Sequence, residues 1–69
     1  MIINYINFKN NEVIFWDKNP KYIPNINEKV RINVEQNITI KGFVIDKLIH
    51  FWNHDKNFIV IDITIKIDC

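Results

Sequence analysis

The sequence predicts an all-β domain: a small five-stranded, strongly bent antiparallel barrel made of two hairpins and a Pro-containing connector. Its composition is the first observation behind this prediction. The chain has 16 isoleucines, which favour strands, and 11 asparagines, which favour turns, but no alanine and a single leucine. Apolar and polar residues also alternate along much of the second half of the chain. At 69 residues the chain is expected to form one domain, residues 1–69.

The clearest element is a hairpin over residues 43–67. Two apolar runs, FVIDKLIHFW and FIVIDITIKI, flank the polar residues NHDKN, which predicts strands 38–52 and 58–67 joined by a loop at 53–57. Strand side chains alternate between faces with period two. One face of the second strand is therefore entirely isoleucine, and we predict that this face is core: Ile59, Ile61, Ile63, Ile65 and Ile67.

The predicted loop sets the register of this hairpin. Phe51 then faces Ile59 on the core side, and further along the strand the core pairs are Ile49–Ile61, Ile45–Ile65 and Phe43–Ile67, while Val44 and Lys66 face solvent. Lys47 falls opposite Ile63, on the core side. We expect a β-bulge near Asp46–Lys47 to turn this lysine outward, because long barrel strands need such a bend.

The outer face of the same hairpin is the candidate binding surface. In this register it is apolar near the loop, with Trp52 opposite Phe58, His50 opposite Val60, and Leu48 beside them. Exposed contiguous apolar patches are uncommon on monomers. These five residues are predicted to contact a protein partner or a second copy of the chain, unless the N-terminal segment covers them.

Residues 1–17 are predicted to form the other hairpin, with strands at about 2–8 and 12–17 and a turn at Asn10–Asn11. Pairing Lys9 with Glu12 places Tyr5 opposite Trp16. Either face of this hairpin could turn inward. If Tyr5 and Trp16 turn outward, they extend the candidate partner-binding surface; otherwise the hairpin is covered on both sides.

The middle of the chain supplies a connector and a third strand. Pro20 and Pro24 make residues 18–28 irregular, and KVRINVE at 29–35 alternates as a strand. Gly42, the only glycine, lies within a strand pattern and predicts a bulge, a sharp bend or a close backbone approach.

One segment carries a resemblance. Residues 23–34, IPNINEKVRINV, contain the pattern P-x-I-x-E-x-V. With the turn, long strand and final hairpin strand that follow, residues 23–67 resemble small SH3-like barrel proteins of phages and mobile elements. In the usual form a glycine precedes the glutamate, where this chain has Asn27. The resemblance implies a non-enzymatic accessory protein, and it carries over a fold without any site residues.

Catalytic and metal chemistry find little support in the sequence. There is no serine for a Ser/His/Asp arrangement, no Gly-rich phosphate loop, and the one cysteine, Cys69, is the last residue. His50 and His54 are too few ligands for zinc. We therefore expect no enzyme, no cofactor and no metal. No apolar run approaches a membrane span, so a cytoplasmic protein is expected.

Two binding functions remain. The preferred one is a protein-binding module, homo-oligomeric or directed at a partner, such as a phage factor that inhibits a host defence protein; the aromatic residues motivate it. The alternative is a small barrel that binds single-stranded nucleic acid, or a nucleotide at a subunit interface. The net charge of +1 gives that alternative no general support. Its predicted phosphate contacts are Lys29, Arg31, Lys41 and Lys56.

Overall fold

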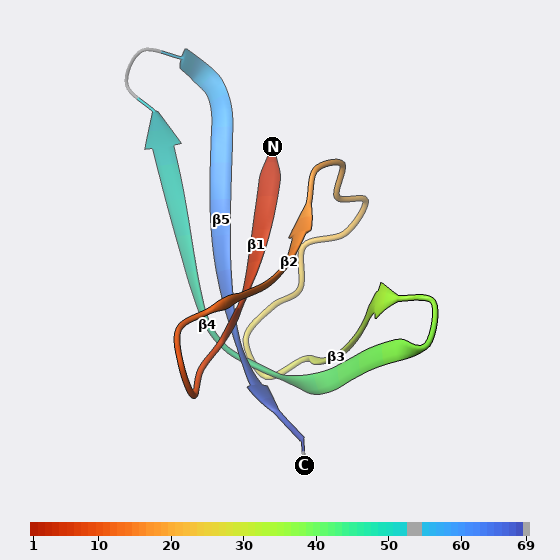
Figure 1. The fold of residues 1–69 in the computed structure, drawn as a ribbon. Coiled ribbons are helices and arrows are strands. Elements are labelled where there is room, and N and C mark those ends of the chain that lie inside the picture. Colours follow the sequence, from red (N-terminus) through yellow and green to blue (C-terminus); the bar gives the residue numbers. More distant parts are fainter. Residues whose placement is uncertain (53–54, 69) are drawn as a thin grey trace.

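A computed structural model describes residues 1–52 and 55–68 of the protein (Figure 1). The five predicted strands are all present in this part of the chain, which contains no helix and hence none that could cross a membrane. They are β1 (Ile2–Asn7), β2 (Val13–Asp17), β3 (Lys29–Glu35), β4 (Ile38–Trp52) and β5 (Asp55–Ile67).

The strands form one sheet in the order β2-β1-β5-β4-β3, curled into a half-barrel (Figure 1). The prediction of a purely antiparallel sheet is wrong, because β1 lies parallel to β5 while the other neighbours are antiparallel. The small, strongly curled, all-β architecture is confirmed. The edge strands β2 and β3 touch across the open seam, but they are not paired with each other in the sheet.

Strand β4 contains the predicted bulge, at a slightly different place. From Lys47 to Phe51 the register is the predicted one, with Lys47 opposite Ile63. The ladder shifts between Val44 and Asp46, so Val44 rather than Ile45 lies opposite Ile65. Val44 is fully buried, and Ile45 is partly exposed. The bulge does not turn Lys47 outward: it stays opposite Ile63, and its Nζ donates to Asn25 Oδ1 in the connector at 3.1 Å.

The loop end of this hairpin also differs from the prediction. β5 begins at Asp55, so Trp52 pairs with Asp55 and not with Phe58. A second register shift, between Phe51 and Trp52, absorbs the difference and keeps Phe51 opposite Ile59.

The core lies on the concave side of the curled sheet, between β1, β5, β4 and β3. Ile3 and Tyr5 turn inward from β1, which decides the orientation that the sequence left open. Their neighbours across the parallel pairing are Ile61 and Ile63. The remaining buried apolar side chains are Ile32, Val44 and Ile65.

The first hairpin departs from the predicted register by two residues next to the turn, where Ile6 faces Val13, and by one residue beyond a register shift between Tyr5 and Ile6. Tyr5 faces Phe15, with ring centroids 6.2 Å apart, and not Trp16. The cause is a longer turn: Asn7 O accepts a hydrogen bond from Asn11 N at 2.8 Å, and Asn11 adopts a left-handed φ of 59°. Asparagine tolerates this conformation better than most residues do.

The connector is held against the bend of β4 by backbone hydrogen bonds. Asn27 N donates to Val44 O at 2.8 Å, and Val44 N donates to Glu28 O at 2.9 Å. Asn27, which stands where the SH3-like pattern has glycine, has a φ of 76°. The asparagine therefore adopts the left-handed backbone conformation for which glycine is the usual residue.

Gly42 marks a close backbone approach, one of the outcomes predicted for it. Its φ is not positive, so space rather than backbone conformation requires the glycine. A Cβ at this position would lie 2.5 Å from both Ile65 Cγ2 and the carbonyl oxygen of Lys66. The backbones of β4 and β5 can cross at this bend only because the side chain is missing.

We predict that Gly42→Ala destabilises the fold by about 1–3 kcal/mol, because the methyl group forces the two strands apart. In a domain of this size, about 1 kcal/mol corresponds to a fall in Tm of roughly 4–8 °C. Thermal unfolding monitored by circular dichroism measures this change in Tm. Lys41→Ala, at the exposed neighbouring position, is the control and should change stability by no more than about 0.5 kcal/mol. An unchanged Tm for Gly42→Ala would contradict the close approach.

Candidate functional site

The outer face of the sheet brings together four of the predicted partner-binding residues. Cross-strand partners share a face, and the pairs Trp16–Asn4, Asn4–Asp62 and Asp62–Leu48 run across β2, β1, β5 and β4. His50 and Val60 form the next pair along. Trp16 and Leu48 are 59% and 55% exposed.

The centre of this face is polar, which the sequence analysis did not foresee. Asp62 accepts a hydrogen bond from Asn4 Nδ2 at 3.0 Å and lies 2.7 Å from His50 Nε2. His50 is thus paired with a carboxylate rather than simply packed on Val60. The polar group separates Trp16 from Leu48, so the two exposed side chains do not form one apolar patch.

The three other predicted partner-binding residues are Tyr5, Phe58 and Trp52. Tyr5 belongs to the core and is 7% exposed, so its assignment to the outer surface is wrong. Phe58 is half-buried. The side chain of Trp52 lies outside the described part of the structure, as do His54, Cys69 and the side chain of Lys56.

Among the described residues, the large apolar side chain with the highest exposed fraction lies on the face predicted to be core. Phe51 is 70% exposed and Ile49 is 45% exposed. The prediction that they are buried fails because β1 covers β5 only from Val60 onward, and β3 covers β4 only as far as Phe43. We call residues 46–52 of β4 with their partners in β5, residues 55–64, the arm. Beside β1 the arm is part of a three-stranded region, and only its tip, beyond the His50–Val60 pair, projects past β1 as a two-stranded ribbon (Figure 1).

The arm exposes apolar side chains on both faces, and one of these faces also carries the polar His50–Asp62 pair. Leu48 lies on one face, and Ile49 and Phe51 lie on the other. Within the described residues, no strand pairs with the arm's part of β4 on the side away from β5. The arm thus offers both exposed apolar side chains and a strand edge.

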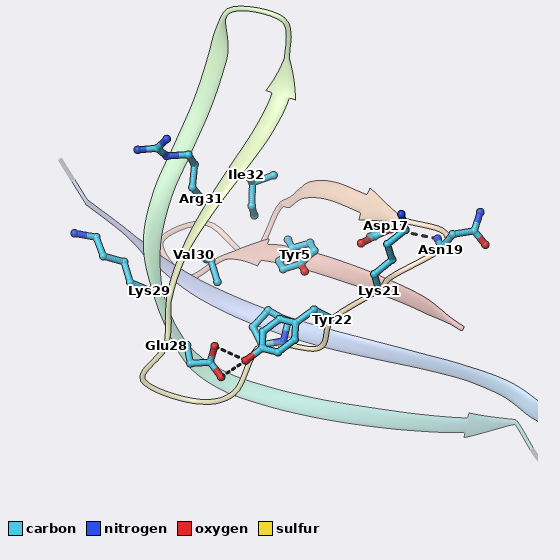
Figure 2. Close-up of a pocket in the computed structure, with 11 residues that line it drawn as sticks. Tyr5, Asp17, Asn19, Lys21, Tyr22, Glu28, Lys29, Val30, Arg31 and Ile32 are labelled. Atoms are coloured by element: carbon cyan, nitrogen blue, oxygen red, sulfur yellow. Dashed lines mark hydrogen bonds between the residues drawn. The ribbon is translucent and has the colours of Figure 1, made fainter.

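A cavity of about 470 Å³ opens at the seam between β2, β3 and the connector (Figure 2). Its charged lining is mixed, with Asp17 and Glu28 against three cations. Tyr5 also lines it, and burial, together with the nearby Asp17 carboxylate, raises the pKa of the Tyr5 phenol. This phenol is therefore neutral at physiological pH and does not act as a base there. The three cations are Lys21, Lys29 and Arg31.

One hydrogen-bonded pair closes part of this cavity. The Tyr22 hydroxyl lies 2.8 Å from both carboxylate oxygens of Glu28 (Figure 2). Asn25 N donates to the same carboxylate at 3.1 Å. These bonds stabilise the ionised acid, so the Tyr22 contact, and then the Asn25 amide, lower the pKa of Glu28. The same contact raises the pKa of Tyr22. The pair ties the connector down and leaves Glu28 ionised at neutral pH.

Three of the four predicted phosphate-binding residues lie together on the outer face. Arg31 pairs with Lys41, and Lys29 pairs with Phe43 on the same side. Phe43 in turn pairs with Lys66. The sequence analysis missed Phe43 and Lys66 as neighbours, because without the shift at Ile45 the phenyl ring would face inward opposite Ile67.

The described residues offer no grouping of metal ligands. In that part of the chain no three His, Cys, Asp or Glu side chains are placed so that they could hold a metal ion. The candidate surfaces are therefore the arm and the outer face, and both are suited to binding.

We predict that Tyr22→Phe destabilises the protein at neutral pH and that the loss shrinks in acid. A lowered Glu28 pKa contributes stability above the unfolded pKa of about 4.3, and this stability disappears as the pH falls through the folded value. Urea unfolding at pH 7, 5 and 3 measures the difference between the two proteins. In a Glu28→Gln background the Tyr22→Phe effect should not vary with pH. An equal loss of stability at pH 3 and pH 7 would show that the Tyr22 hydroxyl does not act by lowering the pKa of Glu28.

Comparison with known proteins adds no relative: no protein-family model, no curated protein and no solved structure matches this chain.

Proposed function

We propose that this protein is a non-enzymatic binding module that acts by protein–protein contact through its arm. The 70% exposure of Phe51 is the observation that carries the proposal. The tip of the arm is a two-stranded ribbon, which is marginally stable by itself in water, and the arm exposes apolar side chains on both faces. A protein that covered Phe51, Ile49 and Leu48 would remove that apolar surface from water, which is the main source of affinity at protein interfaces.

The occupant that we propose is a second copy of the chain. Identical strand edges pair naturally in antiparallel fashion about a two-fold axis, so each copy supplies the same surface. The part of β4 in the arm has such an edge, and its neighbouring side chains are apolar. Two arms joined in this way would continue one sheet across both copies, which gives the two-stranded tips further strand neighbours.

The resemblance to phage and mobile-element proteins supports a setting for this activity. The Ile-, Asn- and Lys-rich composition is typical of an AT-rich genome and is consistent with that origin. In this proposal the protein works in the host cytoplasm as an accessory factor. The arm surface, in one copy or in the dimer, would then occupy a host defence protein and inhibit it.

Self-association is tested by sedimentation velocity over a range of protein concentrations. We expect the wild-type chain to dimerise, and Phe51→Ser to weaken the dimer by at least about tenfold, as loss of an interface anchor does. Trp16→Ser removes a comparably exposed aromatic residue from β2, far from the arm, and is the matched control. At concentrations low enough for both proteins to be monomeric, the variant should unfold at nearly the wild-type temperature, because Phe51 is exposed in the single chain.

Two results would overturn self-association through the arm. One is a wild-type chain that remains monomeric at several hundred micromolar. The other is a dimer that dissociates with Trp16→Ser but survives Phe51→Ser, which would place the contact on the outer face near β2 instead.

A further inference from the structure

A row of aromatic and basic side chains crosses the outer face of the sheet at the end opposite to the arm. Lys29 of β3 pairs with Phe43 of β4, and Phe43 pairs with Lys66 of β5. Phe8 follows β1, and its N–H donates to Ile65 O at 2.9 Å, which extends the β1–β5 ladder and places Phe8 beside Lys66. The row therefore reads Phe8, Lys66, Phe43 and Lys29 across neighbouring strands.

Both aromatic rings in this row are accessible. Phe8 is 56% exposed and Phe43 is 43% exposed. Phe8 and Lys66 line a shared cavity of about 630 Å³ together with Lys9 and Ile67. β1 and β4 are separated by β5, so the two phenyl groups stand about two strand spacings apart, roughly 10 Å, with the Lys66 side chain between them.

Positive charge is concentrated around these rings. Arg31 and Lys41 form the next pair along β3 and β4, and with Lys29 they line a second cavity of about 300 Å³. Five of the nine basic residues of the chain lie on this surface, whereas the whole chain has a net charge of only +1. The five are Lys9, Lys29, Arg31, Lys41 and Lys66. Asp68 is the carboxylate that forms an ion pair with the surface, 3.6 Å from Lys29 Nζ.

The existing contacts of Lys29 are easily exchanged. Its Nζ is 5.5 Å from the centre of the Phe43 ring, and the Lys29 side chain is 60% exposed. Exposed ion pairs and cation–π contacts contribute little to stability, because solvent screens them. The ammonium group can therefore leave Asp68 and the ring for a phosphate at small cost, which also uncovers the phenyl face.

We propose that this surface binds single-stranded nucleic acid. Bases stack on Phe8 and Phe43, and the phosphates between and beside them meet Lys66, Lys29, Arg31 and Lys41. Proteins that bind single strands combine basic residues with aromatic stacking platforms in this way. In a duplex the base faces are already stacked, so the exposed phenyl rings favour a single strand. An acidic polypeptide would use the cations but would gain nothing from the two rings.

Fluorescence anisotropy with a labelled oligothymidylate of about 20 nucleotides tests the proposal. We expect binding at 25 mM NaCl that weakens steeply with salt, with a slope of log K against log salt of about −2 to −3 for three or four phosphate contacts. Phe43→Leu and Phe8→Leu keep apolar volume but lose the stacking surface, and each should weaken binding by roughly 5- to 100-fold. Lys66→Gln should make the slope shallower by about 0.7.

Two matched control variants test whether a loss of binding is specific to this surface. Lys18→Gln changes the net charge as Lys66→Gln does, but it lies in the exposed connector. Trp16→Leu removes an exposed aromatic residue that has no place in the row. Both should bind the oligonucleotide as the wild type does, and so should Phe51→Ser, because the arm is a different surface. Thermal unfolding of each variant confirms that loss of binding is not loss of folding.

Three outcomes would overturn the proposal: no binding at 25 mM NaCl, equal effects of Lys18→Gln and Lys66→Gln, or full affinity in both phenylalanine variants. Poly-glutamate and a DNA duplex of the same length serve as competitors. Equal competition by poly-glutamate would assign the surface to acidic polypeptides, and equal competition by the duplex would assign it to phosphate contacts alone. If the protein does not bind the oligonucleotide but still dimerises through Phe51, this proposal is wrong and the proposed contact through the arm stands.

Discussion

The bulge in β4 is the constraint on which the rest of the structure depends. One extra residue, Ile45, shifts the register of β4 against β5. As a result, the two residues before it point to the opposite faces from those expected for a strand without the bulge. Val44 goes into the core, and Phe43 goes out onto the basic face. The same bend exposes the backbone of Val44 to the connector, which fastens there through Asn27 and Glu28. Core, connector and outer face are thus set by a single irregularity.

Gly42 makes this bend compatible with a sheet. Next to it the backbones of β4 and β5 approach too closely for any Cβ, so the chain uses its only glycine here. Bulges and glycine kinks are the usual devices by which a long strand curves instead of continuing flat. In this protein they separate the part of β4 that packs into the half-barrel from the part that forms the arm.

The arm exists because the neighbouring strands are too short to cover it. β4 and β5 have 15 and 13 residues, whereas β1 and β3 have six and seven. The long hairpin therefore extends past both neighbours, and its apolar side chains remain exposed. The basic and aromatic row lies over packed strands, whereas Phe51 and Ile49 of the arm are exposed. The two surfaces consequently suit different occupants: a protein for the arm, and an extended, charged chain for the row.

The sequence by itself determined the five strands, the isoleucine face of β5, the pairing of Phe51 with Ile59, and the need for a bend in β4. These follow from local alternation and turn chemistry, which act over a few residues. Only the tertiary structure decided that β1 joins β5 in parallel, that Tyr5 turns inward, that Phe43 faces Lys66, and that Phe51 is left exposed. Each of these depends on which strands become neighbours and how far they overlap, and no local pattern contains that information.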